Sequence, residues 1–167
     1  LVACDATKNL RRFVGLGALV GIVVALAIAG VDLKKSVSAG IPGKLFSGMF
    51  TFDSVSIYFR LLLLFMALIA GVWSFPIISR WKKGRGEFWI LFMSCVFGTL
   101  ILASSANMVM IYISLEFVSL TSYALSALLP RNQKSTEAGL KYFIYGAAAS
   151  GVMLFGISLL YGLTGAL

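Results

Sequence analysis

The sequence predicts an all-α membrane protein with about five transmembrane helices, and three observations support this class. The mean hydropathy is +0.98. Only 12% of the 167 residues are charged, whereas about a quarter are charged in soluble domains. The charges also stand in clusters, separated by apolar stretches of about the 20 residues that a bilayer requires. This composition excludes a soluble enzyme.

Composition also limits the partners and cofactors of the chain. The formal net charge is +8, but the basic residues lie in short segments beside apolar runs, as in the loops of membrane proteins. Nucleic acid is therefore not expected as a partner. The sequence has no His and only two Cys, which leaves no ligand set for zinc, haem or an iron–sulfur cluster. Any redox centre is expected on other chains.

The first half of the chain predicts two helices joined by a loop. Residues 13–31 hold no charge and form the first expected helix. Residues 36–51 are rich in Gly and Pro and are expected to form an external loop lying partly at the membrane surface. The second helix is expected over 54–78, with Asp53 as its N-cap. Arg60 lies about 10 Å into this helix, from where its side chain can reach back to the interface.

The next apolar stretch is long enough for two helices. Residues 88–130 contain one charge, Glu116, and are about twice the length of one span. We therefore expect helices over 88–104 and 108–129, with the polar sequence Ser-Ser-Ala-Asn between them as the turn. Pro130 is expected to end the later helix.

The last expected helix begins near Glu137 and continues to about residue 163. Ser135 or Thr136 can cap it, and Glu137 then lies at the positive end of the helix dipole. Five crossings place the two ends of the chain on opposite sides of the membrane. The chain is thus expected to have three segments: residues 1–52 with the first helix and the external loop, 53–87 with the second helix and a basic loop, and 88–167 with three helices.

The distribution of basic residues predicts the orientation. Arg60 and Lys141 lie within helices, three basic residues lie on one side, and nine lie on the other. These nine are Lys8, Arg11, Arg12, Arg80, Lys82, Lys83, Arg85, Arg131 and Lys134. The positive-inside rule therefore places the N-terminus and the loops around Trp81 and Asn132 in the cytoplasm.

Glu116 is the most informative single residue. It lies about 12 Å from one end and 20 Å from the other end of its expected helix. A central carboxylate costs about 2.5 to 3.5 kcal/mol on insertion scales, and proteins that keep one usually use it on an ion or proton path. A low dielectric favours the neutral acid and a nearby cation favours the carboxylate, so a moving lysine can switch proton binding. The alternative is a structural ion pair between helices.

Lys141 is the second charge within a predicted span. It is expected about one turn into the last helix, where its side chain can reach the interface. Glu116 and Lys141 are separated by about 13 Å along the membrane normal if their helices end at similar heights. They are therefore not expected to form a direct pair, and water or another residue would have to link them.

Several motifs in the second half of the chain occur together in one known family. They are Y-I-S-L-E-F-V-S-L at 112–120, S-T-E-A-G-L-K-Y-F at 135–143, G-A-A-A-S at 146–150 and G-I-S-L-L-Y-G at 156–162. In combination they resemble subunit N of NADH-quinone oxidoreductase (respiratory complex I), which is an antiporter-like, proton-translocating subunit. The resemblance is close over residues 88–165.

This resemblance implies that Glu116 and Lys141 lie on a proton path coupled to quinone reduction elsewhere in the complex. NADH, FMN, iron–sulfur clusters and quinone would be held by other subunits. The partners would be other membrane subunits and the lipid bilayer, in a bacterial inner membrane or a thylakoid membrane. The family fold has about fourteen helices with broken helices in two repeats. This chain is expected to hold only the early part of that fold and not to pump by itself.

Two rival interpretations remain open from the sequence. Subunits of multisubunit cation/proton antiporters and of membrane-bound hydrogenases share the same core pattern. The chain could also be a non-catalytic scaffold in a larger complex, in which case removing the charge of Glu116 would alter assembly alone.

Overall fold

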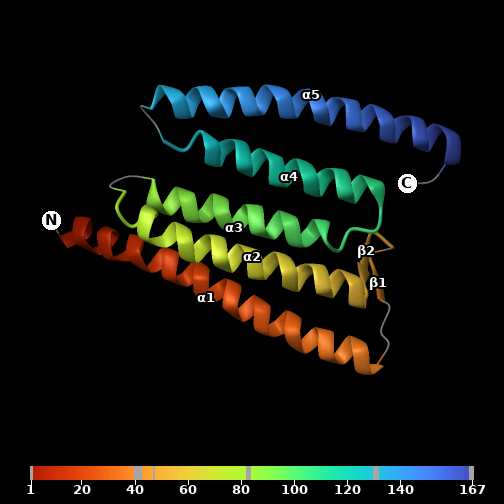
Figure 1. The fold of residues 1–167 in the computed structure, drawn as a ribbon, viewed down its shortest axis with the longest axis horizontal. Helices are drawn as coiled ribbons and strands as arrows, with labels where there is room; N and C mark the ends of the chain where they lie inside the picture. The colour runs from red at the N-terminus through yellow and green to blue at the C-terminus, as the bar shows by residue number, and fades with distance from the viewer. Residues whose placement is uncertain (1, 40–42, 47, 82–83, 130–131, 166–167) are drawn as a thin grey trace.

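The computed structural model describes residues 2–39, 43–46, 48–81, 84–129 and 132–165. This part of the chain forms five helices and a small hairpin (Figure 1). All five helices are long and apolar enough to cross a membrane, which confirms the predicted all-α class. The elements are α1 (Val2–Ala39), β1 (Gly43–Leu45), β2 (Phe50–Phe52), α2 (Ser54–Ile78), α3 (Arg85–Leu102), α4 (Met108–Ser126) and α5 (Gln133–Thr164).

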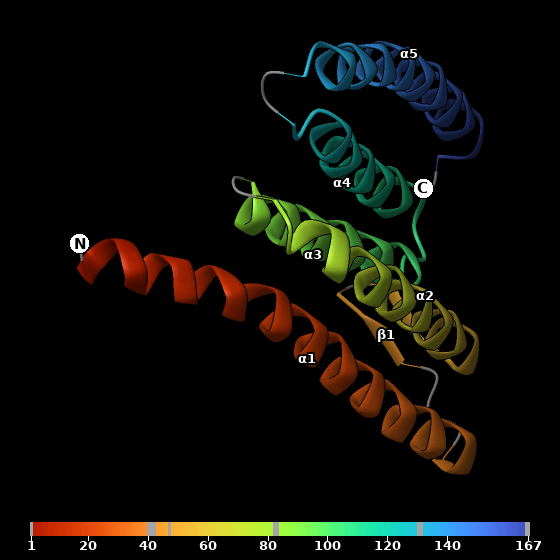
Figure 2. The ribbon, with the colours of Figure 1, turned by 60° about the vertical axis from the view of Figure 1, so that its left-hand side comes forward.

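The helices stand side by side in chain order, with α1 and α5 at opposite edges (Figures 1 and 2). Among the described elements, α1, α2 and α3 all pack against one another, α4 packs against α3, and α5 packs against α4. The main apolar core lies among the first three helices and is centred on Ile22, Leu64 and Val96. By contrast, Gly139 is the only buried residue of α5 within its described range. The second half of the molecule is thus a thin layer attached to a more compact first half.

Two predicted helix boundaries are confirmed by hydrogen bonds at the caps. Helix α2 covers the predicted range, and the Asp53 carboxylate accepts a hydrogen bond from Ser56 N at 2.8 Å. The Ser56 hydroxyl accepts in turn from Asp53 N, which completes a capping box. At the start of α4, Asn107 supplies a side-chain cap by accepting from Val109 N at 2.7 Å. The turn predicted between the third and fourth helices is therefore present.

The predicted start of the last helix was wrong. Helix α5 begins at Gln133, and its N-cap is Asn132, whose side chain accepts from Lys134 N at 3.1 Å. Ser135 instead donates its hydroxyl to Ser126 O at 2.8 Å, which ties the start of α5 to the end of α4. Because the helix starts four residues early, Glu137 lies beyond the first turn and not at the positive end. Asn is as favourable an N-cap as Ser or Thr, so a helix start after Asn132 and one after Ser135 or Thr136 both agree with the sequence.

Helices α1 and α4 also differ from their predicted lengths. Helix α1 continues past residue 31 through Asp32, Lys34 and Lys35 to Ala39, because charged residues outside the hydrocarbon do not break a helix. Helix α4 ends at Ser126 and not at 129. Pro130, which was expected to end this helix, lies outside the described residues.

The predicted external loop contains a hairpin that the sequence did not indicate. Strands β1 and β2 pair antiparallel with Leu45 opposite Phe50. The second strand also pairs with the turn between α3 and α4, because Thr51 N donates to Ser104 O at 2.9 Å and Ala106 N donates to Met49 O at 2.9 Å. The hairpin therefore closes one end of the α2–α4 layer.

Arg60 attaches α2 to this same end. Its Nε donates to the Ser104 hydroxyl at 2.7 Å, and its guanidinium lies 5.0 Å from the centre of the Phe52 ring. The carboxylate of Asp32 on α1 also attracts this charge through space. The side chain reaches toward the end of its helix, as expected, but it binds specific protein groups there.

Candidate functional site

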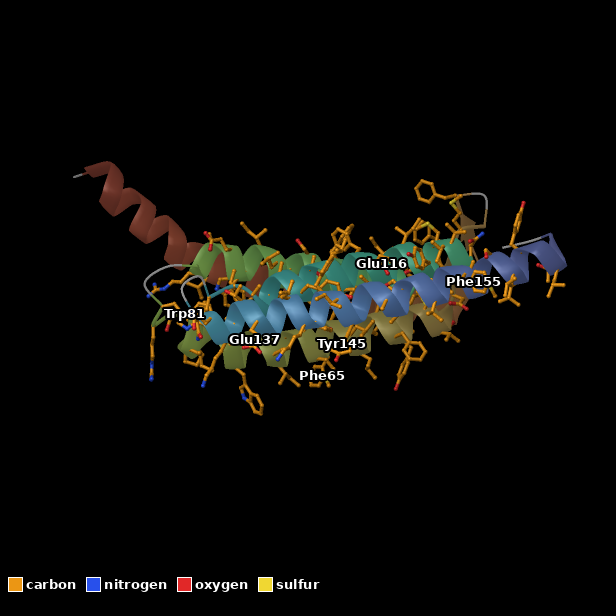
Figure 3. All side chains as sticks on the ribbon, turned by 90° about the horizontal axis from the view of Figure 1, so that it is seen from above. Phe65, Trp81, Glu116, Glu137, Tyr145 and Phe155 are labelled. Atoms are coloured by element: carbon orange, nitrogen blue, oxygen red, sulfur yellow. The ribbon has the colours of Figure 1, made fainter. Side chains whose placement is uncertain are left out.

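Glu116 lies close to the middle of its helix. Because α4 runs from Met108 to Ser126, the residue is about 12 Å from one end and 15 Å from the other. It is therefore more central than the sequence indicated. Figure 3 shows it between Trp81 and Glu137 toward one end of the bundle and Phe155 toward the other. Its side chain is half-buried.

The helical repeat places Glu116 on the face of α4 that meets α5. Tyr123 is seven residues later, which is close to two full turns, so the two side chains share a face. The ring of Tyr123 packs edge-to-face on Tyr142, with centroids 4.6 Å apart, and on Phe143. A methyl group on Gly146 would overlap the Tyr123 hydroxyl. Because α4 and α5 are antiparallel, Glu116 lies toward the part of α5 that follows Gly146.

Small residues allow α5 to approach α4 closely. A Cβ on Gly139 would lie 2.5 Å from the Cβ of Ala127, and one on Gly146 would meet Tyr123. The seven-residue spacing of Gly139 and Gly146 puts both on one helix face. Gly146 lies on this contact, whereas a Cβ on Gly151, five residues later, would meet nothing within 4 Å. The sequence did not indicate the role of Gly139, because its close contact depends on Ala127 of another helix.

No hydrogen bond or ion pair to Glu116 is present among the residues that the structure describes. Within the part of the chain that the structure describes, no cation is therefore paired with this acid. A polar contact on the α4–α5 boundary joins the hydroxyls of Ser122 and Tyr142, which are 3.3 Å apart. This pair lies almost two turns from Glu116, toward the end where Glu137 lies.

Lys141 lies elsewhere on the bundle. Its Nζ is 2.5 Å from the Glu137 carboxylate, one turn earlier on α5, and both side chains are more than half exposed. Lys141 is two residues from Gly139 and five from Gly146, so it faces away from α4. The early start of α5 puts it about 12 Å into the helix, two turns and not one. The structure thus does not bring Lys141 and Glu116 together.

Most hydroxyl groups near the site bind their own helix. Ser114 is buried and donates to Met110 O at 2.6 Å, and Thr121 donates to Phe117 O at 3.0 Å. Such bonds satisfy a hydroxyl within an apolar layer. A contact between α4 and the turn that precedes it joins Ser114 and Ser105, whose hydroxyl oxygens are 3.3 Å apart. Among the described residues, no group of three or more His, Cys, Asp or Glu side chains could hold a metal ion.

In its amino-acid sequence, the chain is similar to one group of membrane proteins. A family model described as NADH:quinone oxidoreductase/Mrp antiporter, TM, matches residues 105–167. NADH-quinone oxidoreductase subunit N of Rhodospirillum rubrum is 38% identical over 152 residues, which cover 91% of this chain and 30% of that protein. Subunit N of Rhizorhabdus wittichii is 37% identical over 166 residues, covering 99% of this chain and 33% of that protein. The chain thus spans about a third of the length of these relatives.

Solved structures give the same result for the fold. A chain of respiratory complex I from Thermus thermophilus superposes with a TM-score of 0.73 at 33% identity, covering 99% of this chain and 35% of that one. A chain of an archaeal membrane-bound sulfane sulfur reductase superposes with a TM-score of 0.78, covering 92% and 32%. At 19% identity, this second likeness concerns the fold alone.

Proposed function

The chain belongs to the subunit N family of NADH-quinone oxidoreductases, and we propose that it carries part of a proton path in a proton-pumping complex of this kind. It is a multi-pass membrane protein. Its role would be to bind and release protons while quinone is reduced on other subunits. The observation that carries the proposal is the position of Glu116, half-buried near the middle of α4.

Glu116 is proposed to be the group that holds the proton within the membrane. A carboxyl group in hydrocarbon favours its neutral form, and an approaching cation favours the carboxylate. Because the described helices supply no such cation, proton release would follow the approach of a charge from elsewhere in the assembly. The central position divides the membrane into two nearly equal halves that water could bridge from either side.

Lys141 is proposed to pass protons on the cytoplasmic side. Its exposed pairing with Glu137 is easily exchanged, because a solvent-exposed ion pair contributes little free energy. The pair lies on the face of α5 that no described helix covers, so a proton donor or acceptor can approach it. The excess of basic residues in the loops around Trp81 and Asn132 supports the cytoplasmic assignment of this end.

The proposed setting is a bacterial inner membrane, with other membrane subunits of the complex as partners. NADH, FMN, iron–sulfur clusters and quinone would lie on other subunits, with no redox centre on this chain. The names of the relatives favour this role over a cation/proton antiporter.

The test replaces Glu116 with Gln and with Ala in the full-length protein within its complex. Proton translocation and electron transfer are measured in the same membranes. We expect both variants to lose translocation. The matched control is Glu87→Gln, which removes an exposed carboxylate in the first turn of α3 and should leave translocation unchanged. Unchanged translocation in both Glu116 variants would contradict the proposal, and a loss of assembled complex with normal translocation per electron would favour the scaffold.

A further inference from the structure

A cavity of about 390 Å³ opens among α1, α2 and α3 at the end of the bundle that carries the basic loop. Gly15 of α1, Phe75 of α2 and Trp89 of α3 form its apolar walls. Ser79 and Arg85 lie at its polar side, directly after α2 and at the start of α3. The volume falls within the range of small-molecule sites, about 300 to 1,000 Å³.

A second cavity, of about 460 Å³, shares Trp89 with the first and lies between α1 and α3. Its lining includes Ala18, Met93 and Phe97, and these side chains are apolar. The hydroxyl of Ser94 in this lining is already used, since it donates to Ile90 O at 2.9 Å. From Trp89 to Phe97 the lining extends about 12 Å along α3. An apolar groove therefore extends from Trp89 toward the middle of α3, next to the more polar cavity.

The polar opening carries an excess of positive charge. The Nε of Arg85 donates to Trp81 O at 2.5 Å, and its Nη2 donates to Ser79 O. These carbonyl groups fix the guanidinium but leave its charge without a carboxylate partner among the described residues. The same loop holds three more basic residues, Arg80, Lys82 and Lys83. The nearby acid in the sequence, Glu87, is exposed and lies two residues on from Arg85, on another side of α3.

Trp89 lies between the two cavities. The residue is 3% exposed. Its indole Nε1 faces α1 at Gly15, where a Cβ would lie only 2.8 Å away. The ring therefore packs closely on α1 and forms a wall of both cavities.

We propose that this site binds one anionic phospholipid. The phosphate would lie at the opening, attracted by Arg85. One acyl chain would occupy the groove between α1 and α3. Basic pockets between transmembrane helices on the cytoplasmic side are suited to anionic headgroups. The site is separate from Glu116, because α4 and α5 contribute nothing to either cavity.

The apolar groove decides between a lipid and a soluble anion. Inorganic phosphate would use the opening alone and would leave the groove between α1 and α3 without an occupant. The charge at the opening decides between lipids, since a zwitterionic headgroup gains less from an arginine than an anionic one. One basic residue near an anionic lipid headgroup corresponds to about a five-fold preference in binding.

The test uses the full-length protein, in its complex, reconstituted into phosphatidylcholine vesicles. These contain trace phosphatidylglycerol with a photoreactive group in one acyl chain. After illumination, labelled peptides are mapped. We expect labelling on residues 14–18 and 89–97, about five-fold above that by the phosphatidylcholine analogue. Excess unlabelled phosphatidylglycerol should suppress it, and inorganic phosphate should not. Equal labelling by both analogues, or no label on these peptides, would overturn the proposal.

Variants then separate the headgroup from the groove. Arg85→Gln should abolish the preference for phosphatidylglycerol, whereas Arg80→Gln, which removes an exposed charge outside the cavity lining, should keep it. Ala18→Phe fills the groove without touching Arg85 and should reduce labelling at residues 89–97. If labelling persists unchanged in both Arg85→Gln and Ala18→Phe, the lipid does not occupy this site. The comparison of the two lipid analogues on the unaltered protein remains decisive if a variant fails to fold.

Discussion

Replacing Gly139 with Ala should separate α5 from α4, because the added methyl group has no space. The new Cβ would lie 2.5 Å from the Cβ of Ala127 and 3.1 Å from its Cα, whereas ordinary contacts are 3.4–4 Å. The helices would have to move apart by about 1 Å, since a backbone atom cannot rotate away. Overpacking of this kind costs about 1 to 3 kcal/mol. Helix propensity offsets at most about 1 kcal/mol of it.

The matched control is Gly151→Ala on the same helix, where a Cβ meets nothing within 4 Å. The free energy of unfolding of each full-length variant would be measured by titration from mild detergent into sodium dodecyl sulfate. We expect Gly139→Ala to be less stable than Gly151→Ala by about 1 to 3 kcal/mol. The double variant Gly139→Ala, Ala127→Gly should recover part of the loss, because it removes the 2.5 Å approach. Equal stability of the two single variants would refute the close α4–α5 contact.

Three further predictions concern the caps and charges. Ser104→Ala should lower the unfolding free energy by about 1.5 to 3 kcal/mol, because Arg60 loses the hydroxyl that accepts from its Nε, and should speed proteolysis in the hairpin. Asp53→Ala should cost about 1 kcal/mol in the same detergent titration, whereas Asp53→Asn should retain most of the cap. Lys141→Ala and Glu137→Ala should each change stability by less than about 1 kcal/mol, because their pair is exposed. A larger loss of stability would show that the pair has further partners.

The helices could be predicted because the hydrocarbon of a bilayer allows the backbone few conformations. Each backbone polar group within hydrocarbon must be bonded internally, so an apolar stretch of sufficient length becomes a helix. Asp53 could be identified as an N-cap because it has a short side chain that accepts hydrogen bonds and directly precedes an apolar stretch. The start of α5 was harder, since Asn132, Ser135 and Thr136 are all good caps. Only contact with the end of α4, through Ser135 and Ser126, distinguishes among them.

The hairpin and the neighbours of Glu116 were not predictable, because each depends on segments far apart in the chain. Thr51 pairs with the backbone at Ser104, and nothing local to either segment encodes that pairing. The depth of Glu116 depends on helix length alone, so its distance from each helix end could be predicted to within one turn. Which face of α4 carries the acid follows from the helical repeat, but that this face meets α5 depends on Gly139 and Gly146.

The arrangement of the helices bears directly on how Glu116 could change its affinity for protons. Helices α1 to α3 share a buried core, so moving one of them exposes apolar side chains on the others. Helix α5 packs against α4 alone among the described elements, through Gly139, Gly146 and the aromatic rings around Tyr123. A shift of α5 would therefore alter the surroundings of Glu116 while α1 to α3 stay in place. Because Gly139 lies at one end of that contact, the variant that separates the helices there should disturb proton translocation even though it touches neither Glu116 nor Lys141.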